Sequence, residues 1–534
     1  MIKTLVVNNF KGSMTIYQYG DINSGLAFVT NQFGSDPFTK PGNLTWCNSS
    51  VQIDAAGSVV TDLIMAAKER VEGNILYVYA IGHLGRLYKI QVNNPVTFNP
   101  NFDNPVLLAT LTAQSPTFTR GGFIDFFGST ERIYIGHDVG VTRIDFDGTN
   151  ETFIGVAGSY TATVPRPLKQ FLGKLYFGNG TNIGEIDSTA TVTDYTKLNP
   201  GFTAGTQVRD IDLTPDGIYL QIVVSNQSLP DITATAQDTI STASTGSWIF
   251  KWNGTDAGYT SFTSFPTFSL TANTLFQNYN YTFGYDQLGC AVFNPNEKIL
   301  TQQEVVSPLP NAVRSTGNLV TAMSPLHFEG FMEADMLVFG SLDFELGLGY
   351  WDLFGQLATS PETDIIQVPC QIPVSNFGIG TSSNSYTDSI FGTAKIYFST
   401  LETSAAPTTA YNLYRWSPPS SPLATSTPLD GAIYQTQTQL FSKKITVKEV
   451  RIYGESWVTN NSFTIDLIGS AGTAITNGSQ TFTVGTNLTV GDDFAWWSPA
   501  IEPTYALGLM ITNAGSINHV ITKIEIDYEE RGGK

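Results

Sequence analysis

One pattern of four short strands recurs along most of this chain and constrains its fold more than any other feature. Its clearest copy, residues 122–155, has four runs rich in β-branched and aromatic residues, separated by turn-forming residues. The third run ends at Phe146 and is followed by Asp147-Gly148, a dipeptide that tolerates the positive φ angles of a tight hairpin turn. Four short antiparallel strands in a row make one blade of a β-propeller. The pattern therefore predicts a propeller blade.

Similar patterns precede and follow this copy at spacings of roughly 40–60 residues, which is typical of propellers rather than of solenoids. The inner strands share an aromatic residue near their second position: Tyr77, Tyr134, Tyr176, Tyr219 and Tyr397. The seven expected blades cover residues 63–111, 122–155, 168–198, 208–265, 274–303, 319–369 and 377–416. The last blade has no assignable outer strand, and a Thr/Ser/Ala-rich loop, 227–246, is expected to project from the fourth.

A ring of such sheets solves a burial problem, because a single four-stranded sheet cannot bury both of its faces. Blades in a ring cover one another and leave only short edges. We therefore predict an all-β fold, with a β-propeller of about seven four-stranded blades over residues 58–416. Six or eight blades, or unrelated antiparallel sheets with similar turns, are the alternatives.

The segments on either side of this region differ in character. Residues 1–57 are irregular and are expected to form an N-terminal arm that packs on the propeller or on a partner, part of it as a candidate closing strand for the last blade. Residues 417–432 are a Pro/Ser-rich linker. Beyond it, Lys444–Glu449 and Thr522–Glu529 alternate as half-buried strands do. Residues 433–534 are therefore predicted to form a C-terminal β-sandwich of the jelly-roll type.

Composition supports strands over helices and limits the partners. Charged residues make up 14% of the chain and aromatic residues 12%, and aromatic residues favour strands. The best helix candidate, Val60–Arg70, is interpreted as the first strand of a blade. The formal net charge of −19 argues against nucleic-acid binding through phosphate contacts, which needs clustered Lys and Arg. It suits solubility, or a channel lining that lets DNA pass without binding.

Cysteine usage and hydropathy indicate a protein that assembles in a reducing cytoplasm. The three cysteines, Cys47, Cys290 and Cys370, are widely spaced and form neither a disulfide framework nor a C-x-x-C metal site. No apolar run approaches the roughly 20 residues that span a bilayer. The first ten residues lack the features of a secretory signal. We expect no membrane span.

Candidates for metal and acid/base chemistry each have a simpler structural interpretation. His83 and His137 occupy equivalent places in consecutive blades, which indicates repeat ancestry unless both converge with carboxylates on a metal. The carboxylate pairs Asp145/Asp147 and Asp210/Asp212 could do acid/base work, but such residues in β-proteins usually bind backbone amides at turns.

Sequence motifs of the common enzyme classes are missing as well. There is no G-x-S-x-G elbow, P-loop or H-E-x-x-H motif, and neither the S-x-D-x-G-x-T-W box of sialidase-like propellers nor a repeated W-D pattern. We therefore predict a protein that is not an enzyme, with no catalytic, cofactor-binding or metal-binding residues.

Three tryptophans of the C-terminal domain, Trp457, Trp496 and Trp497, are the candidate contact residues for a partner or a glycan. Aromatic side chains can stack on sugars or anchor a protein interface. The alternative interpretation places all three in the sandwich core.

Three stretches carry a resemblance to known virion proteins: G-D-I-N-S-G (Gly20–Gly25), F-T-R-G-G-F-I-D-F-F-G (Phe118–Gly128) and I-T-K-I-E-I-D-Y-E-E (Ile521–Glu530). With the propeller pattern, they make the chain resemble structural proteins of tailed bacteriophages of the marine, podovirus-like type, in particular the propeller-bearing tail nozzle proteins. The resemblance implies a virion tail protein, assembled in the host cytoplasm as a hexameric ring. It further implies DNA passage through the ring without specific binding, and contacts with adaptor and fibre proteins of the tail.

Two other functions stay open at this point. One is a glycan- or receptor-binding tail protein, using the propeller loops or the region of Trp496. The other is a glycosidase-like propeller enzyme, for which Asp212 is the residue to test.

Overall fold

The computed structural model describes residues 2–8, 43–46, 64–92, 103–201, 205–226, 246–265, 431–455, 457–470, 472–515 and 518–531, with a few single residues elsewhere. It also gives the paired backbone of strands β2–β4, β6 and β23–β31. Every assigned element in this part is a strand, which confirms the all-β prediction. Within the same part, no helix is long and apolar enough to cross a membrane. The loop at 227–245 and the side chains of all three cysteines lie outside the described residues.

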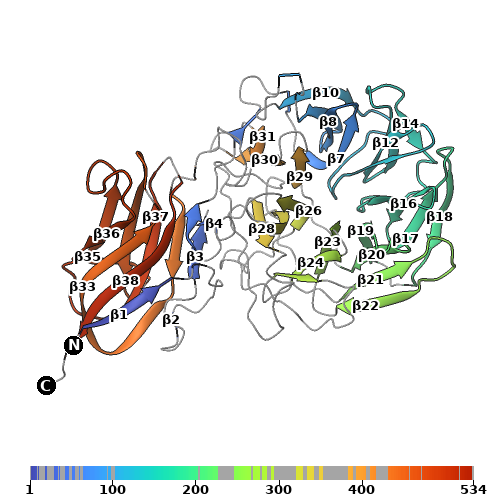
Figure 1. The fold of residues 1–534 in the computed structure, drawn as a ribbon. Coiled ribbons are helices and arrows are strands. Elements are labelled where there is room, and N and C mark those ends of the chain that lie inside the picture. The colour runs from blue at the N-terminus through green and yellow to red at the C-terminus, as the bar shows by residue number, and fades with distance from the viewer. Residues whose placement is uncertain are drawn as a thin grey trace.

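Seven small antiparallel sheets follow one another along the chain and form a propeller (Figure 1). Blade one contains β7 (Ile64–Glu72), β8 (Ile75–Gly82), β9 (Arg86–Gln91) and β10 (Asn104–Thr110). Blade two contains β11 (Phe123–Phe127), β12 (Arg132–His137), β13 (Gly140–Ile144) and β14 (Thr152–Ile154). Blade three contains β15 (Leu168–Phe171), β16 (Lys174–Asn179), β17 (Asn182–Ile186) and β18 (Val192–Leu198).

The remaining blades complete the series. Blade four contains β19 (Gln207–Leu213), β20 (Leu220–Ser225), β21 (Ser247–Trp252) and β22 (Ser261–Phe265). Blade five contains β23 (Ser269–Phe276), β24 (Tyr279–Tyr285) and β25 (Cys290–Phe293). Blade six contains β26 (Val320–Phe328), β27 (Ala334–Ser341) and β28 (Leu348–Asp352). Blade seven contains β29 (Ser383–Asp388), β30 (Thr393–Thr403), β31 (Thr409–Trp416) and β6 (Val51–Gln52).

The first strands of the blades form a closed ring. Each contacts the first strand of the next blade, in the order β7, β11, β15, β19, β23, β26, β29, and β29 contacts β7 again. Blade seven obtains its outer strand from the N-terminal region, because β6 pairs with β31. This pairing confirms the expectation of a closing strand.

Some details of blades five to seven differ from the expectation or fall outside the described residues. Blades five and six show three strands each, since the expected fourth strands, 298–303 and 365–369, lie outside the described residues. The expected first strand of blade seven, 377–380, also lies outside them, and β29 at 383–388 takes that position. Its polar sequence, S-N-S-Y-T-D, lacks the apolar run by which strands are recognised.

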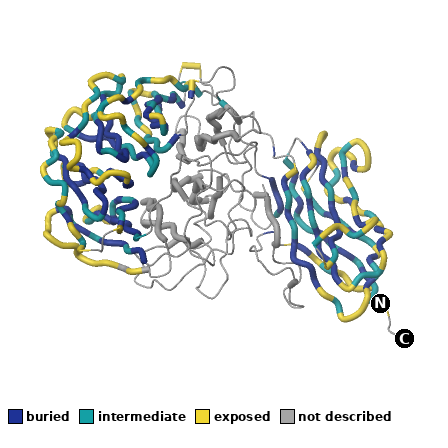
Figure 2. Tube along the Cα trace, turned by 180° about the vertical axis from the view of Figure 1, so that it is seen from behind, coloured by how far each residue is buried: buried dark blue, intermediate teal, exposed yellow. Residues whose placement is uncertain are grey.

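Apolar layers between neighbouring blades hold the ring together. In one such layer, Tyr79 and Ile81 of β8 pack with Phe126 of β11 and Ile133 and Ile135 of β12, all buried. In blades two to four, the second strands β12, β16 and β20 are almost fully buried, whereas exposed residues of the described part gather at turns and outer strands (Figure 2). Burial of such side chains contributes roughly 1.5–3 kcal/mol each, and it explains why the sequence signal is strongest on these strands.

The C-terminal domain is a jelly roll built mainly from β32 (Ile433–Thr436), β33 (Thr438–Gly454), β34 (Ser462–Ile468), β35 (Ala474–Thr483), β36 (Phe494–Trp497), β37 (Thr504–Asn513) and β38 (Ile521–Glu530). An eighth strand, β1 (Ile2–Val7), comes from the other end of the chain and pairs with β38. The strand orders are β1-β38-β33-β36 and β32-β37-β34-β35, linked where β33 also pairs with β37. Numbered along the chain, these orders are those of two interlocked Greek keys.

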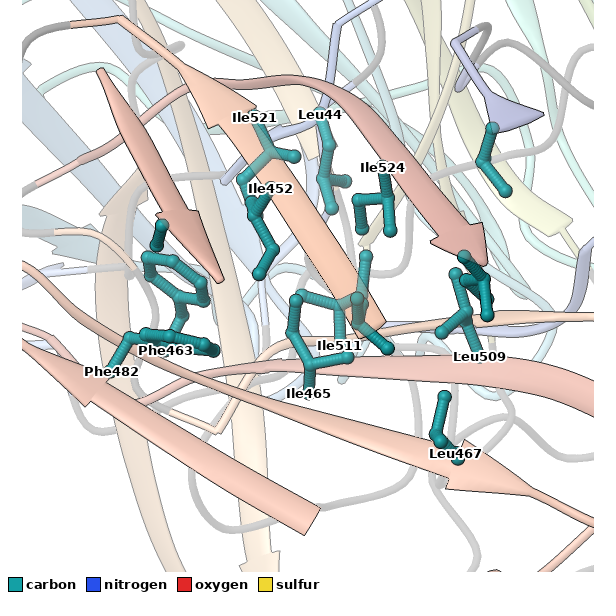
Figure 3. Close-up of a cluster of buried hydrophobic side chains, with 14 of the residues drawn as sticks. Leu44, Ile452, Phe463, Ile465, Leu467, Phe482, Leu509, Ile511, Ile521 and Ile524 are labelled. Atoms are coloured by element: carbon teal, nitrogen blue, oxygen red, sulfur yellow. The ribbon is translucent and has the colours of Figure 1, made fainter. Parts of the chain in front are cut away.

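The two sheets enclose one apolar core. Phe463, Ile465 and Leu467 of β34 face Ile452 of β33 and Ile524 of β38, and all are buried (Figure 3). Alternate residues of each strand point inward, as the sequence pattern of Thr522–Glu529 predicts. This core lies in the part of the chain predicted to form a sandwich.

The N-terminal arm is the main correction to the expected domain organisation. Residues 2–7 form the first strand of the jelly roll, and Leu44 bridges to Ile521 of β38. Two further short strands, β2 (Tyr19–Gly20) and β3 (Val29–Phe33), pair with β33 and β32, while β4 (Ser35–Asp36) pairs with β5 (Thr45–Trp46). The arm thus packs largely on the C-terminal domain, because the edge of β38 needs a partner strand. The propeller is inserted between the first and second strands of the jelly roll.

Candidate functional site

The three candidate tryptophans have different environments in the jelly roll. Trp457 is 0% exposed and Trp497 is half-buried, and both contact the core through Phe463 and Phe482. Trp496 is 58% exposed. A fully buried side chain cannot touch a partner, so Trp457 is a core residue, as the alternative interpretation had it. Trp496 is the one of the three that is available for contacts.

Strand register explains the exposure of Trp496. On β36, Ala495 is buried, whereas Phe494 and Trp496 on either side of it are exposed. Trp496 lies opposite Arg451 of β33, and Phe494 lies opposite Tyr453. Directly opposed residues project from the same side of a sheet. The outer side of this sheet therefore displays two aromatic residues from β36 beside Arg451 and Tyr453.

Neighbouring strands extend these pairs into rows across the sheet. One row consists of Trp496, Arg451, Glu525 and Val6, and the next begins with Phe494 and continues with Tyr453 and Lys523. A third contains Glu449, Asp527 and Thr4. We call the side chains of these three rows the outer face of the jelly roll.

Arg451 is the centre of an ion-pair network on the outer face. Its guanidinium lies 2.8 Å from Asp527, 3.4 Å from Glu525 and 3.7 Å from Glu449. Asp527 also accepts a hydrogen bond from the Thr4 hydroxyl at 2.6 Å, so the network reaches the N-terminal strand. The charges of this face are largely compensated by one another.

Tyr453 joins the aromatic residues to this network. Its ring lies 5.1 Å from that of Phe494, and the Lys523 ammonium lies 4.0 Å from its centroid. Its hydroxyl donates to Glu525 at 2.9 Å. The pKa of Tyr453 is raised by desolvation and by this hydrogen bond, while the hydrogen bond from Lys523 lowers the pKa of Glu525. Both groups keep their usual charge near neutral pH, and the face stays rigid and polar.

The candidate histidines do not form a metal site in the described residues. His137 is fully buried, with Nε2 3.0 Å from the Thr142 hydroxyl and its ring beside Phe118 and Phe153. Burial lowers its pKa to about 3, so the imidazole is neutral. The equivalent residue His83 is half-buried in the turn after β8. Across the described part of the chain, no three His, Cys, Asp or Glu side chains gather as metal ligands.

Asp145 and Asp147 support a turn. Asp147 accepts hydrogen bonds from the amide and the hydroxyl of Thr149, and these bonds lower its pKa. Asp145 pairs with Arg132 at 2.7 Å and accepts from Asn150. The same turn recurs in blade three, where Asp187 binds Thr189. These carboxylates have the structural role that the sequence analysis weighed against acid/base chemistry.

Charged residues of the first strands join adjacent blades. Lys68 pairs with Asp125, and Lys169 pairs with Asp212. Burial alone would lower the pKa of Lys169, but Asp212, Asp125 and Asp210 outweigh it and the pKa is raised. Asp212 is thus an ion-pair partner across the contact between blades three and four.

The most elaborate polar cluster lies between blades two and three, and the sequence analysis did not identify it. The buried Arg166 donates hydrogen bonds to the carbonyls of His137, Asp138, Thr161 and Gly178 and to the side chain of Asn179. Its guanidinium lies 4.7 Å from the ring of Tyr160, and burial lowers its pKa to about 10. Since its hydrogen-bonding groups are occupied by protein, Arg166 is structural. Its isolated place in a loop sequence offers no signal of this role.

Comparison with known proteins finds only distant structural similarity. No protein-family model and no curated protein matches the sequence. Among solved structures, the Pan2 WD40 domain of Neurospora crassa is similar at 8% identity and a TM-score of 0.37, over 71% of this chain and 96% of that one. The N-terminal domain of Nup159 is similar at 11% identity and a TM-score of 0.36, over 73% and 97%. An extracellular domain from B. thetaiotaomicron is similar at 11% identity and a TM-score of 0.41, and the chain spans 62% of its length.

Proposed function

We propose that this protein is a non-catalytic structural component of a bacteriophage tail, of the nozzle type. The tail assignment comes from the resemblance of Gly20–Gly25, Phe118–Gly128 and Ile521–Glu530 to such proteins. In this proposal several copies form a ring around the DNA channel, and each copy binds adaptor and fibre proteins.

The observation that supports this proposal best is the insertion of the propeller into the jelly roll. The chain runs from β1 of the jelly roll through the propeller and back to β32. Two chain segments therefore connect the domains, which restricts their relative rotation more than a single linker does. A propeller and a jelly roll that are joined in this way suit a protein that holds other proteins at fixed positions.

The candidate catalytic carboxylates give further support. Asp145, Asp147 and Asp212 are engaged in turns and ion pairs. The acidic net charge of −19 is compatible with a channel through which DNA slides, because phosphates are repelled rather than bound.

Native mass spectrometry of the purified protein, alone and mixed with its tail neighbours, tests this proposal. The expected result is a hexamer, or a ring that forms only on a tail partner. A stable monomer that ignores every other tail protein would overturn it. DNA binding that weakens steeply with salt would contradict the passive channel.

A further inference from the structure

The outer face of the jelly roll combines features that suit a neutral sugar ligand and disfavour a nucleic acid. Its aromatic residues lie together at one edge, where Trp496 is 58% and Phe494 39% exposed. A dense group of hydrogen-bonding side chains lies directly beside them, on β33 and β38. Exposed apolar residues that lie together and are rimmed by polar groups mark binding sites, whereas single exposed ones do not.

The charge balance of the face indicates what kind of ligand fits. Its carboxylates outnumber its cations by three to two: Glu449, Glu525 and Asp527 against Arg451 and Lys523. These groups are paired with one another, so no cation is held in reserve for an anion. An acidic ligand would meet a slight excess of negative charge, and phosphate-bearing ligands are disfavoured for the same reason.

The paired charges can still form hydrogen bonds with a neutral ligand. A carboxylate has about four acceptor sites and a guanidinium five donor hydrogens, so one ion pair does not use them all. Hydroxyl groups of a sugar can both donate and accept, and they bind paired charges without adding charge. Arg451 and Asp527 are held in place by the network, which reduces the entropy lost on binding.

The aromatic residues complete this match. The apolar faces of pyranose rings stack on aromatic side chains, which carry a large hydrophobic surface. Trp496 lies two residues from Phe494 along β36, on the same side of the strand, and directly opposite Arg451. A sugar stacked on Trp496 therefore has the guanidinium of Arg451 next to it, and the next sugar of a chain would reach Phe494 and Tyr453.

We propose that the outer face of the jelly roll binds a neutral oligosaccharide of hexose or N-acetylhexosamine units, with Trp496 as the stacking platform and Arg451, Tyr453 and Asp527 as hydrogen-bonding residues. Trp497 points to the core side and takes no part. This inference goes beyond the structural role in a tail and does not depend on it, since ring assembly and sugar binding are measured separately.

The test uses the full-length protein and defined sugars. Neutral hexaoses of glucose, mannose, galactose and N-acetylglucosamine are titrated by calorimetry and by tryptophan fluorescence, with a galacturonate hexaose as the acidic comparison. At least one neutral hexaose is expected to bind, and Trp496→Ala is expected to weaken it by about tenfold or more, as for a contact residue at the centre of a site. Tyr505→Ala is the matched control, because Tyr505 is 54% exposed on the same domain but outside the three rows. It should leave the affinity unchanged.

Several results would overturn the proposal. The proposal is wrong if none of the four neutral hexaoses binds, if the galacturonate hexaose binds more tightly than they do, or if the wild type and Trp496→Ala bind equally well. If Trp496→Ala does not fold, Trp496→Leu keeps an apolar side chain and removes the aromatic platform. Arg451→Lys keeps the positive charge but loses the fork of the guanidinium, and it should weaken binding without abolishing stacking on Trp496.

Discussion

The indole Nε1 of Trp46 donates a buried hydrogen bond of 2.9 Å to Nε2 of His519. Trp46 is fully buried, and its backbone exchanges two more hydrogen bonds with the side chain of Asn518. Its indole therefore anchors the N-terminal segment to the jelly roll, five residues before β6 enters blade seven. The segment that closes the propeller thus starts from a fixed point on the other domain.

Substitution of Trp46 should destabilise the jelly roll selectively. Trp46→Ala removes a fully buried indole, and the loss for such large-to-small changes is roughly 3–5 kcal/mol. Trp46→Phe keeps most of the apolar volume but loses the hydrogen bond to His519, which should lower the free energy of unfolding by about 1–2 kcal/mol. Urea unfolding followed by near-UV circular dichroism measures both. Trp496→Phe is the control at an exposed tryptophan and should change stability by less than about 0.5 kcal/mol; equal effects at both positions would contradict an anchoring role for Trp46.

The propeller could be predicted from sequence because its signals are local. Tyr134 and Tyr176 lie on buried middle strands flanked by tight turns, and blades one and four also have largely buried second strands. The role of residues 2–7 in the jelly roll was missed because pairing between β1 and β38 joins opposite ends of the chain, and no local pattern reports such a contact.

The candidate site could be predicted in part. Trp496 was identified by its residue type. That Trp457 is buried while Trp496 is exposed follows from the loop after β33 and from tertiary packing. Arg451 and Tyr453 alternate on β33 and so share one side of it, but neither was identified from the sequence. Their position opposite β36 was not predicted either, because register between distant strands depends on the whole fold.

Removal of β1 should destabilise the jelly roll, and an added peptide with the sequence of β1 should restore it. Leu5 and Val7 of β1 pack on the core, and burial of each contributes roughly 1.5–3 kcal/mol. A chain lacking residues 1–8 should thus lose at least about 3 kcal/mol, and its exposed β38 edge should promote aggregation. A peptide of residues 1–10 should restore monodispersity in light scattering, whereas the same peptide with Val7→Asp should not. An unchanged unfolding midpoint after the deletion would show that β1 is dispensable.

Replacement of Arg166 should loosen the contact between blades two and three. Arg166→Met leaves several buried carbonyls without donors, and losses of about 3–5 kcal/mol are typical when one partner of a buried polar network is removed. Arg166→Lys keeps the charge but cannot reproduce the planar fork that reaches both Thr161 and Gly178, so it should also destabilise. Hydrogen exchange of β12 and β16 is the measurement. Lys448→Met, at an exposed pair with Glu529 in the jelly roll, is the control and should cost less than about 1 kcal/mol.

Acidification should destabilise the propeller through His137 before most carboxylates titrate. Burial lowers the pKa of His137 to about 3 from the usual 6.5 of a histidine, so between these values the unfolded chain binds a proton that the folded chain does not. The stability that depends on neutral His137 is therefore fully present above pH 6.5. It falls by up to about 4 kcal/mol as the pH drops toward 3, since each pKa unit corresponds to about 1.36 kcal/mol. Between pH 6.5 and 5, where carboxylates are still charged, His137→Gln should flatten this dependence, and His83→Gln should leave it in place. Unfolding midpoints at several pH values decide the matter: a slope that survives in His137→Gln would assign the acid sensitivity to other groups.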